Sequence, residues 1–390
     1  MEFFWDLSNT ARILGTVFVA AFLIQAYYYL YYYSGMIFYN RKMKKGKIAY
    51  NTSKPPVSVI ICAKNEAENL AAFLPLILEQ NYPEYEVIVV NDGSTDESNE
   101  ILEKYGEKYL HLYRTFLPME AKYMSHKKMC LTVGIKAAKY ENLLLTDADC
   151  EPAGKEWISN MVRNFTGKSE IILGYGGHKY KKGLLNKMVS FDVLFIAMQY
   201  MGFALKRKPY MGVGRNLSYK KELFFKNKGF ASHLNLASGD DDLFIKEVAN
   251  KENIRVEFSP ESVTWSARKM TFKSFRYQKE RHLSTSPSYT FATQLRIGME
   301  VFFRALFYVM FIVLAAYFIH IQDYIAAGIT GGIFLLRYMI QLIVVNCTAG
   351  ILREKKFVFS MLFFDIFLPL VSLYIFTLGR IGAKKQSMWR

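Results

Sequence analysis

The stretch Asn142-Leu143-Leu144-Leu145-Thr146 is followed directly by Asp147-Ala148-Asp149. The apolar run is typical of a buried parallel strand, and it places two carboxylates at the carboxyl end of that strand. Open α/β sheets bind their ligands at this edge, and adjacent carboxylates suit Mg²⁺ or Mn²⁺ carrying phosphate oxygens. The pattern indicates a site for a metal ion and a diphosphate, although two solvated acids in a turn would give the same short motif.

Two units upstream repeat a pattern of a short β-branched strand, a polar turn and a helical stretch. Residues 57–62 lead into Ala63-Lys64-Asn65-Glu66 and a helix over 69–79, and residues 86–90 lead into Asn91-Asp92-Gly93-Ser94 and a helix over 95–104. The alternation predicts a mostly parallel sheet with crossover helices. Carboxylates gathered without neutralising bases would repel one another, so we expect a metal ion and substrate hydroxyls to relieve the repulsion. The side chains expected to share one rim are Asn65, Glu66, Asp92, Asp147 and Asp149.

Long apolar segments flank this α/β region. Residues 13–38 exceed the roughly 20 residues that cross a bilayer, and they lack the basic start and cleavage site of a signal peptide, which predicts a permanent anchor. Further candidate spans cover 301–321, 324–345 and 357–378. Arg304 and Arg337 are expected to reach the membrane interface from the ends of their spans, and Asp365 to face other helices. The predicted organisation is an anchor (1–40), a cytoplasmic domain (41–298), about three membrane helices (299–380) and a basic tail (381–390).

Basic residues next to the first span set the expected orientation. Arg41, Lys42, Lys44, Lys45 and Lys47 follow this span, whereas Glu2, Asp6 and Arg12 precede it. The α/β domain is therefore predicted to lie in the cytoplasm, in a multi-pass protein of the cell (inner) membrane. Four spans would leave the carboxyl terminus outside, against the preference of Arg380, Lys384, Lys385 and Arg390. Either one late segment lies along the interface or turns back, or the bias fails at this end.

The overall charge narrows the classes of partner. The chain of 390 residues has 50 Lys and Arg against 34 Asp and Glu, a net charge of +16. Anionic lipid headgroups and an anionic nucleotide substrate both account for this excess. Nucleic acid is not expected, because no recognition-helix or zinc-finger pattern is present and the bases are spread out. The four cysteines form no Cys-x-x-Cys pair, which suits reduced thiols, and Cys150 is expected to be a packed thiol rather than a nucleophile.

Five motifs follow one another in a specific order between about Pro55 and Ser284. They are Val57-Ser58-Val59-Ile60-Ile61 with Asn65-Glu66, Asn91-Asp92-Gly93-Ser94, Asp147-Ala148-Asp149, Gly239-Asp240-Asp241-Asp242 and Gln278-Lys279-Glu280-Arg281-His282. Together they resemble the membrane-anchored family 2 glycosyltransferases, a branch that includes cellulose, chitin and hyaluronan synthases. The resemblance implies a GT-A fold, which is Rossmann-like, a nucleotide-diphosphate sugar donor that is usually a UDP-sugar, Mg or Mn, and inversion at the anomeric carbon.

On the donor side, the resemblance implies that Glu66 and Asp92 hold the nucleoside. Asp147 would touch the nucleotide or sugar and Asp149 would ligate the metal ion, so the pair forms the expected metal site. Lys127 or Lys128 takes the family's basic position near the donor. Directly before these lysines, where the family has a glycine, this chain has His126, which is expected to be a surface residue.

On the acceptor side, the resemblance makes Asp241 the base that takes the acceptor proton. Asp240 to Asp242 could instead only cap a helix over 240–250. Arg281 would neutralise charge on the departing diphosphate, with Gln278 one turn earlier on the same helix face. His282 stands where the family has a tryptophan beneath the acceptor sugar, and Gly214 and Arg215 would line the acceptor side or form only a turn.

Two functions remain open after this comparison. The first is an inverting glycosyltransferase that extends a polysaccharide, and the second transfers one sugar to a membrane lipid. Few spans and His282 in place of tryptophan speak against a self-sufficient processive synthase, whereas an inactive membrane scaffold is disfavoured because all the motif acids are present. Residues 188–205 are predicted to form an amphipathic helix at the membrane surface or under the acceptor, or else a buried core helix. The oligomeric state is left open.

Overall fold

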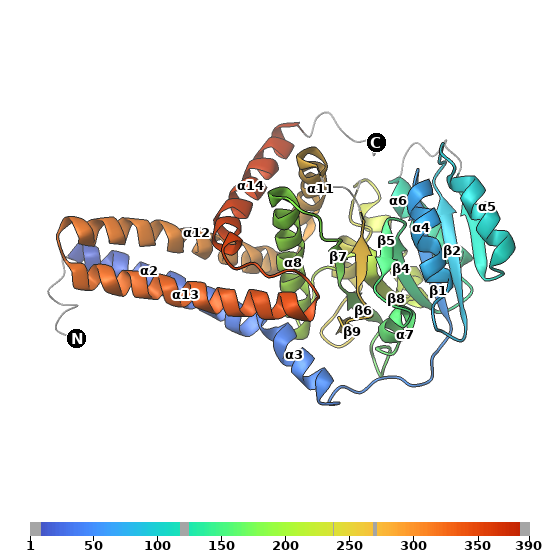
Figure 1. The fold of residues 1–390 in the computed structure, drawn as a ribbon, viewed down its shortest axis with the longest axis horizontal. Coiled ribbons are helices and arrows are strands. Elements are labelled where there is room, and N and C mark those ends of the chain that lie inside the picture. The colour runs from blue at the N-terminus through green and yellow to red at the C-terminus, as the bar shows by residue number, and fades with distance from the viewer. Residues whose placement is uncertain (1–8, 118–124, 237, 268–270, 383–390) are drawn as a thin grey trace.

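The computed structural model describes residues 9–117, 125–236, 238–267 and 271–382. An α/β domain forms one end of the molecule, and long apolar helices project from it (Figure 1). The acids before the first span, Glu2 and Asp6, lie outside the described residues, as do the tail residues Lys384, Lys385 and Arg390 and the side chain of Arg380.

The domain is built on a seven-stranded sheet in the order β3-β2-β1-β4-β8-β6-β9. β1, β2, β3 and β4 are parallel to one another, β8 is antiparallel to both β4 and β6, and β9 is parallel to β6. The predicted mostly parallel, Rossmann-like sheet is therefore confirmed. Its strands are β1 (Val57–Ala63), β2 (Tyr85–Asn91), β3 (Leu112–Phe116), β4 (Asn142–Asp147), β6 (Ile171–Gly174), β8 (Leu217–Lys220) and β9 (Ile254–Glu257).

Helices cover both faces of this sheet, which explains why its central strands are apolar without alternation. Successive side chains of a strand point to opposite faces. Ile60 of β1 joins the core under α6 and α8, whereas Val59 and Ile61 join the core under α4, α5 and α7. The covering helices are α4 (Ala67–Leu78), α5 (Ser98–Lys108), α6 (His126–Ala137), α7 (Trp157–Val162) and α8 (Leu184–Leu205).

A second, smaller sheet lies beyond the end of β4. β10 (Thr264–Ser266) pairs antiparallel with β5 (Cys150–Pro152) and parallel with β7 (Gly176–His178). Three further helices, α9 (Lys221–Lys226), α10 (Asp242–Val248) and α11 (Phe272–Thr285), complete the domain. The short sheet holds the segment after Asp149 next to β10, so it fixes the backbone that carries the predicted metal ligands.

The apolar helix α8 belongs to the core of the domain. Of the residues in its most apolar window, 72% are buried, against 22–28% for the other four helices that are long and apolar enough to span a membrane within the described residues. A β-carbon added at Gly202 would lie 2.6 Å from the carbonyl oxygen of Tyr32, so glycine permits α8 to touch the amino-terminal helix closely. Of the alternatives predicted for residues 188–205, the buried core helix is confirmed and the surface helix is wrong.

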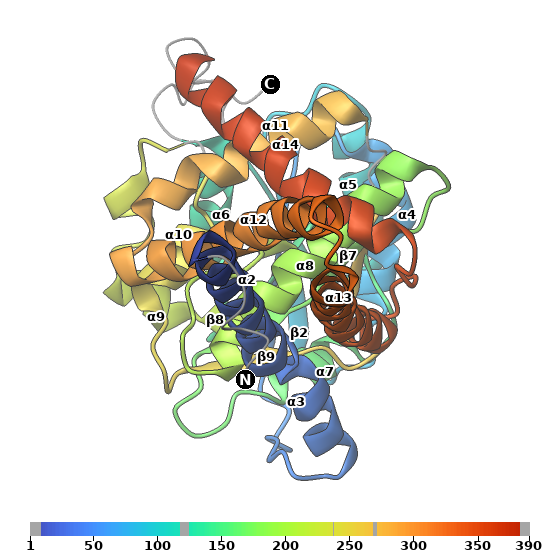
Figure 2. The ribbon, with the colours of Figure 1, turned by 90° about the vertical axis from the view of Figure 1, so that its left-hand side faces the viewer.

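Three helices form an elongated bundle that projects from the domain. α2 (Asn9–Tyr27) continues through a π-helical turn (Tyr28–Tyr33) into α3 (Gly35–Lys44), and α12 (Phe291–His320) packs against both α2 and α13 (Tyr324–Ile351). The last helix, α14 (Ser360–Gly382), leaves the bundle and packs against α11 and α8. Figures 1 and 2 show α14 lying across the bundle axis rather than along it.

The charged residues of these helices meet in one buried cluster. Arg337 Nη2 lies 3.0 Å from Asp365 Oδ2, Arg304 Nη1 lies 3.3 Å from Asp365 Oδ1, and Arg304 Nη2 lies 2.5 Å from Glu300 Oε2. The exposed fractions of the two arginine side chains are only 5% and 2%. The expectation that Arg304 and Arg337 reach the interface is therefore wrong, because each finds a carboxylate on a neighbouring helix or turn. The expectation that Asp365 faces other helices is confirmed.

Candidate active site

The carboxyl ends of β1, β2 and β4 meet at one edge of the sheet. Ala63 pairs with Asn91 across β1 and β2, and Cys62 pairs with Asp147 across β1 and β4. The loops that follow are joined by hydrogen bonds: Asn65 Oδ1 accepts from the Thr95 amide at 2.8 Å. Asn65 itself has a φ of 54°, a left-handed conformation that asparagine tolerates. The predicted common rim for Asn65, Glu66, Asp92, Asp147 and Asp149 is therefore present.

Bases lie among these acids. Asp92 is 4% exposed, and its carboxylate lies 3.2 Å from Lys64 Nζ and 2.9 Å from His126 Nδ1. His126 is half-buried at the start of α6, so it is not the plain surface residue that was expected. Lys127 Nζ lies 3.0 Å from Asp147 Oδ1 and 3.4 Å from Asp240 Oδ2. The expectation of carboxylates without neutralising bases is wrong, because α6 begins directly beside the rim.

The two lysines at the start of α6 point to different surroundings. Lys128 is fully buried, and its ammonium group donates to the carbonyl oxygens of His233 and Leu236 at 2.5 and 2.9 Å. Burial lowers the pKa of Lys128 to about 8. Either Lys127 or Lys128 was expected near the donor. Of the two, only Lys127 faces the rim, whereas Lys128 binds the loop before Asp240.

The predicted metal ligands lie together on the rim. One oxygen of Asp147, one of Asp149 and the sulfur of Cys150 lie within 4.8 Å of one another. Asp149 Oδ2 also accepts a hydrogen bond from Ser266 Oγ at 3.0 Å, which orients the carboxylate. Burial and the two aspartates raise the pKa of the Cys150 thiol well above its usual value, so the thiol stays protonated and packed, as expected. The two carboxylates fit a hard divalent cation such as Mg²⁺ or Mn²⁺.

Asp241 lies at the start of α10 and accepts two backbone hydrogen bonds. The Gly214 amide donates to Oδ2 and the Asp242 amide donates to Oδ1, each at 2.8 Å. Burial, together with Asp240 and Asp242, raises the pKa of Asp241 to about 7. A partly exposed carboxylate with this pKa can accept a proton near neutral pH, so the arrangement suits the predicted base as well as a helix cap.

The neighbours of Asp241 have different environments. Burial alone would raise the pKa of Asp240, but Lys127 and Arg281 hold it below its ordinary value. Asp242 is 2% exposed and accepts hydrogen bonds from Thr285 Oγ1 at 2.5 Å and Tyr289 Oη at 2.8 Å. Asp242 therefore links α10 to the end of α11, whereas Asp240 belongs to the charged cluster around Lys127.

The predicted residues of the last motif lie on α11. Arg281 is close enough to Asp240 to lower the pKa of that carboxyl, and its Nε is buried without a hydrogen-bond partner within the described part of the chain. This donor is available to an anion. Burial, together with Arg281 and Lys279, lowers the pKa of His282 to about 3. His282 is therefore neutral at physiological pH, and it faces a cavity that Gln278 and Arg215 also line.

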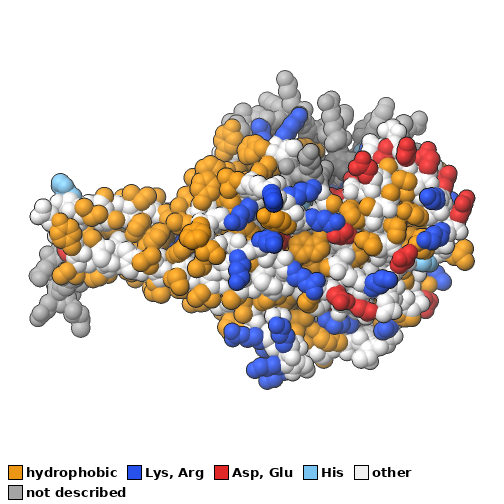
Figure 3. Space-filling view, in the orientation of Figure 1, with side chains coloured by type: hydrophobic (Ala, Val, Ile, Leu, Met, Phe, Trp, Pro, Cys, Tyr) orange, Lys and Arg blue, Asp and Glu red, His pale blue; other side chains and the backbone are white. Residues whose placement is uncertain are grey.

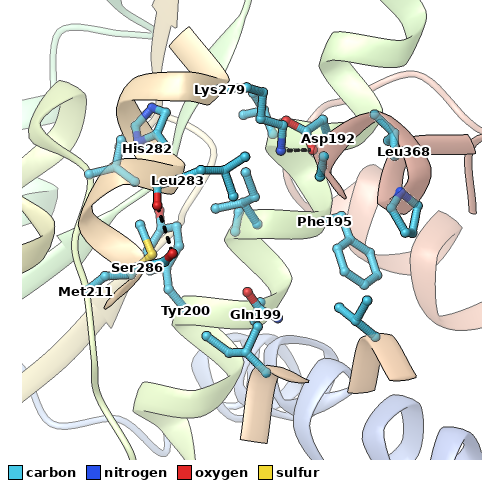
Figure 4. A pocket seen from close by; sticks show the side chains of 18 of the residues that line it. Asp192, Phe195, Gln199, Tyr200, Met211, Lys279, His282, Leu283, Ser286 and Leu368 are labelled. Atoms are coloured by element: carbon cyan, nitrogen blue, oxygen red, sulfur yellow. Dashed lines mark hydrogen bonds and ion pairs between the residues drawn. The ribbon is translucent and has the colours of Figure 1, made fainter. Parts of the chain in front are cut away.

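This cavity has a volume of about 620 Å³ and lies where the domain meets the apolar helices. In Figure 4, α11 carries His282 and Leu283 on one side and Ser286 follows directly after it, α8 carries Asp192, Phe195 and Gln199, and α14 brings Leu368 from the opposite side. Gly214 borders a separate small cavity with Lys127, Asp147, Asp240 and Asp241, and the next residue, Arg215, lines the large one. The Gly214–Arg215 segment therefore lies between the acidic rim and the large cavity.

Some residues near the site were not predicted from the sequence. Glu354, in the loop between α13 and α14, accepts a hydrogen bond from Tyr175 Oη at 2.7 Å, and burial raises its pKa to about 7. It lies close to Gly177 of β7. In the sequence Lys64 is only part of a polar turn, and Ser266 ends a short strand that matches none of the motifs. Their positions depend on contacts across 28 to 179 residues of sequence, which no local pattern signals.

Comparisons with known proteins bear on the family and the fold of this chain. The family model "Glycosyl transferase family 2" matches residues 58–226. The chain is 37% identical over 93 residues to the poly-beta-1,6-N-acetyl-D-glucosamine synthase of Staphylococcus epidermidis, which covers 24% of this chain and 21% of that protein. It is 37% identical over 100 residues to the cholesterol galactosyltransferase of Borreliella burgdorferi, which covers 25% of each. The chain thus matches a quarter or less of the length of these two curated relatives.

A solved structure shares the fold. The mannosyltransferase of Pyrobaculum calidifontis in complex with GDP-Man and Mn²⁺ superposes with a TM-score of 0.52 at 17% identity. The superposition covers 87% of this chain and 99% of that one. The α/β domain therefore has the GT-A fold, as expected.

Proposed function

We propose that this chain, which belongs to glycosyl transferase family 2 through residues 58–226, moves a sugar from a nucleotide-diphosphate sugar to an acceptor hydroxyl at the membrane, with inversion. The observation that carries the proposal is the position of Lys127, which joins Asp147 of the donor side to Asp240 beside Asp241. Donor and acceptor groups are thereby held around one small cavity, which favours reaction between two bound substrates.

On the donor side, Glu66 and Asp92 would hold the nucleoside and Lys127 would attract the diphosphate. A divalent cation bound by Asp147 and Asp149 would supply positive charge to the diphosphate oxygens. Lys64 and His126 fix the carboxylate of Asp92 between two donors, so this acid is oriented before the donor arrives. The resemblance to family 2 glycosyltransferases implies a UDP-sugar, and the solved neighbour is in complex with GDP-Man, so both kinds of donor are candidates.

During transfer, the acceptor oxygen attacks the anomeric carbon from the face opposite the diphosphate. The new carbon–oxygen bond forms as the bond from the anomeric carbon to the diphosphate oxygen breaks. Asp241 takes the proton of the acceptor hydroxyl. The nucleoside diphosphate leaves with the bonding electron pair, and Arg281 stabilises its negative charge through the free Nε donor. Gln278 and His282 would position the acceptor from the same helix.

For the membrane arrangement, we propose three spans, α2, α12 and α13, with α14 lying along the interface on the cytoplasmic side. Exposed bases at the end of α3 and in the loop between α13 and α14 support this orientation. Figure 3 shows Lys and Arg side chains gathered around the junction of the bundle and the domain. The outer face of α14 exposes apolar side chains, as an interfacial helix requires: Phe363, Phe367, Leu370 and Leu373.

The proposal is tested with purified full-length chain in detergent. A panel of UDP- and GDP-sugars is offered with Mn²⁺ or Mg²⁺ and with membrane lipids or saccharides, and the released nucleotide and the product mass are measured. We expect one donor to be turned over, and NMR of the product to show an inverted anomeric configuration. Failure to bind or turn over any nucleotide sugar, or a product with retained configuration, would contradict the proposal.

A further inference from the structure

We propose that the large cavity binds the acceptor as a membrane lipid with an uncharged, hydroxyl-bearing head group. This inference rests on the proposed function and names the acceptor class that the relatives leave open. The alternative acceptor, a soluble or growing saccharide chain, would need a cavity lined with hydrogen-bonding groups. The reasons lie in the walls of the cavity, in the pairing of its charges and in its position.

The walls are mainly apolar and come from two helices of the domain, from α12 and from α14, which is proposed to lie at the interface. Phe195 of α8, Leu283 of α11 and Leu368 of α14 approach the space from different sides (Figure 4). Burial of hydrocarbon against such walls contributes about 25 cal/mol per Å². A sugar hydroxyl placed there without a partner would cost roughly 1–3 kcal/mol. The composition of the walls therefore favours a hydrocarbon chain over a saccharide chain.

Of the described residues, three bases line the cavity, and two of them, Lys279 and Arg304, are paired with carboxylates. The third, Arg215, lies next to Gly214 at the end nearest the acidic rim, where its Nη1 donates to the Gly177 carbonyl oxygen at 3.4 Å. Lys279 Nζ lies 2.7 Å from Asp192 Oδ1, and both side chains are nearly buried at 11% and 12% exposure. Arg304 pairs with Glu300, and both of these residues line the cavity wall. Because each of these two bases already has a carboxylate, neither calls for an anionic head group such as a phosphate. A neutral head group fits this pattern.

The remaining polar groups are suited to hydroxyls. Gln199 Oε1 accepts a hydrogen bond from Tyr210 Oη at 2.9 Å, and both residues line the cavity. Gln278 and the neutral ring of His282 add groups that can donate or accept. Amide and hydroxyl groups of this kind fix the orientation of a small polar head in an otherwise apolar pocket.

The position of the cavity connects the bilayer to the reaction centre. Arg215 and His282 line the cavity. Their chain neighbours are Gly214, which borders the small cavity, and Arg281, which lies near Asp240. The Gly214 amide binds Asp241 directly at 2.8 Å. At the other side, α12 and α14 expose apolar side chains, which suit contact with the bilayer. A lipid that enters between these helices would place its hydroxyl at the end of the cavity nearest to the proposed base.

Two glycines provide matched variants for a test. Gly298 of α12 lines the cavity, and Gly328 of α13 is not one of the lining residues. A β-carbon added at either position meets nothing within 4 Å, so both sites accept a larger side chain. Gly298→Phe should fill the cavity, whereas Gly328→Phe should add the same side chain to an outer helix surface.

The experiment uses the full-length chain in phosphatidylcholine vesicles that contain diacylglycerol, polyprenyl phosphate or no addition, with soluble N-acetylglucosamine oligomers as a further arm. Nucleotide release is measured in each arm, and binding of a fluorescent diacylglycerol is measured separately. We expect diacylglycerol to stimulate release at least tenfold more than the other acceptors. Gly298→Phe should weaken lipid binding and the stimulation by diacylglycerol at least tenfold, while nucleotide binding is unchanged. Gly328→Phe should retain lipid binding and the stimulation.

The outcomes separate the two proposals. Lipid binding that Gly298→Phe abolishes, with no turnover of any donor, would keep the lipid site and overturn the proposed function. Turnover with saccharide oligomers, and no effect of Gly298→Phe on either readout, would keep the glycosyltransferase and overturn the lipid site. Preference for polyprenyl phosphate over diacylglycerol would overturn the neutral head group.

Discussion

Replacement of Asp241 by asparagine tests the centre of the mechanism. Both carboxylate oxygens accept a backbone N–H at 2.8 Å, from Gly214 and Asp242. An amide has one accepting oxygen, so its NH₂ group must face one of these donors. We expect the lost hydrogen bond to lower the free energy of unfolding by about 1–3 kcal/mol. The amide cannot take a proton, and we expect transfer to fall by about 10²–10⁴-fold, which corresponds to about 3–5 kcal/mol of transition-state stabilisation.

The pH profile gives a second readout of the same substitution. Burial, Asp240 and Asp242 raise the pKa of Asp241 to about 7. Because a base acts in its ionised form, kcat/KM of the native chain should fall about tenfold per pH unit below this value and level off above it. The Asp241→Asn variant should lack this acidic limb. Steady-state transfer between pH 5 and 9, with nucleotide affinity from calorimetry, measures both effects.

Asp242→Asn provides the matched control. Its carboxylate accepts from the Leu243 amide, Thr285 and Tyr289, so an amide there should cost a similar loss of stability. Transfer should persist, and the acidic limb should move to lower pH because a negative charge next to Asp241 is removed. If Asp241→Asn retains near-native transfer, or if both variants lose it equally at equal stability, Asp241 is not the base.

Three further predictions concern the metal site, the buried cluster and the orientation. Asp149→Ala should abolish transfer that depends on Mn²⁺ or Mg²⁺ while the circular dichroism spectrum is unchanged, and full turnover after chelation would show that no cation is needed. Asp365→Asn should lower the free energy of unfolding in detergent by about 3–5 kcal/mol, because Arg304 and Arg337 stay buried without their shared carboxylate; an unchanged melting temperature would contradict this. A cysteine introduced at Lys168, which is 82% exposed on the domain, should resist impermeant maleimide added outside intact cells, and efficient labelling would invert the proposed topology.

The local pattern of the sequence determined the sheet and its rim. β4 is buried over its first five residues, and Asp147 is partly exposed at its end. A continuous apolar run between helical segments is typical of a strand that is covered on both faces. Once strands and helices alternate, the acids after β1, β2 and β4 must reach the same edge. The metal pair and the motif order therefore follow from residues that are close in the sequence.

The tertiary structure decided which neighbours these groups have. Consecutive residues of a helix differ by roughly 100° in direction, so the phase of α6 against the sheet directs Lys127 to the rim and Lys128 to the carbonyls of His233 and Leu236. Arg304 could have reached the interface, but the crossing of α14 brings Asp365 to within 3.3 Å of it. The cavity between α8, α11, α12 and α14 likewise has no local signal. Its walls come from segments up to about 200 residues apart, and the sum of these long-range packing contacts, rather than any motif, creates the space for an acceptor.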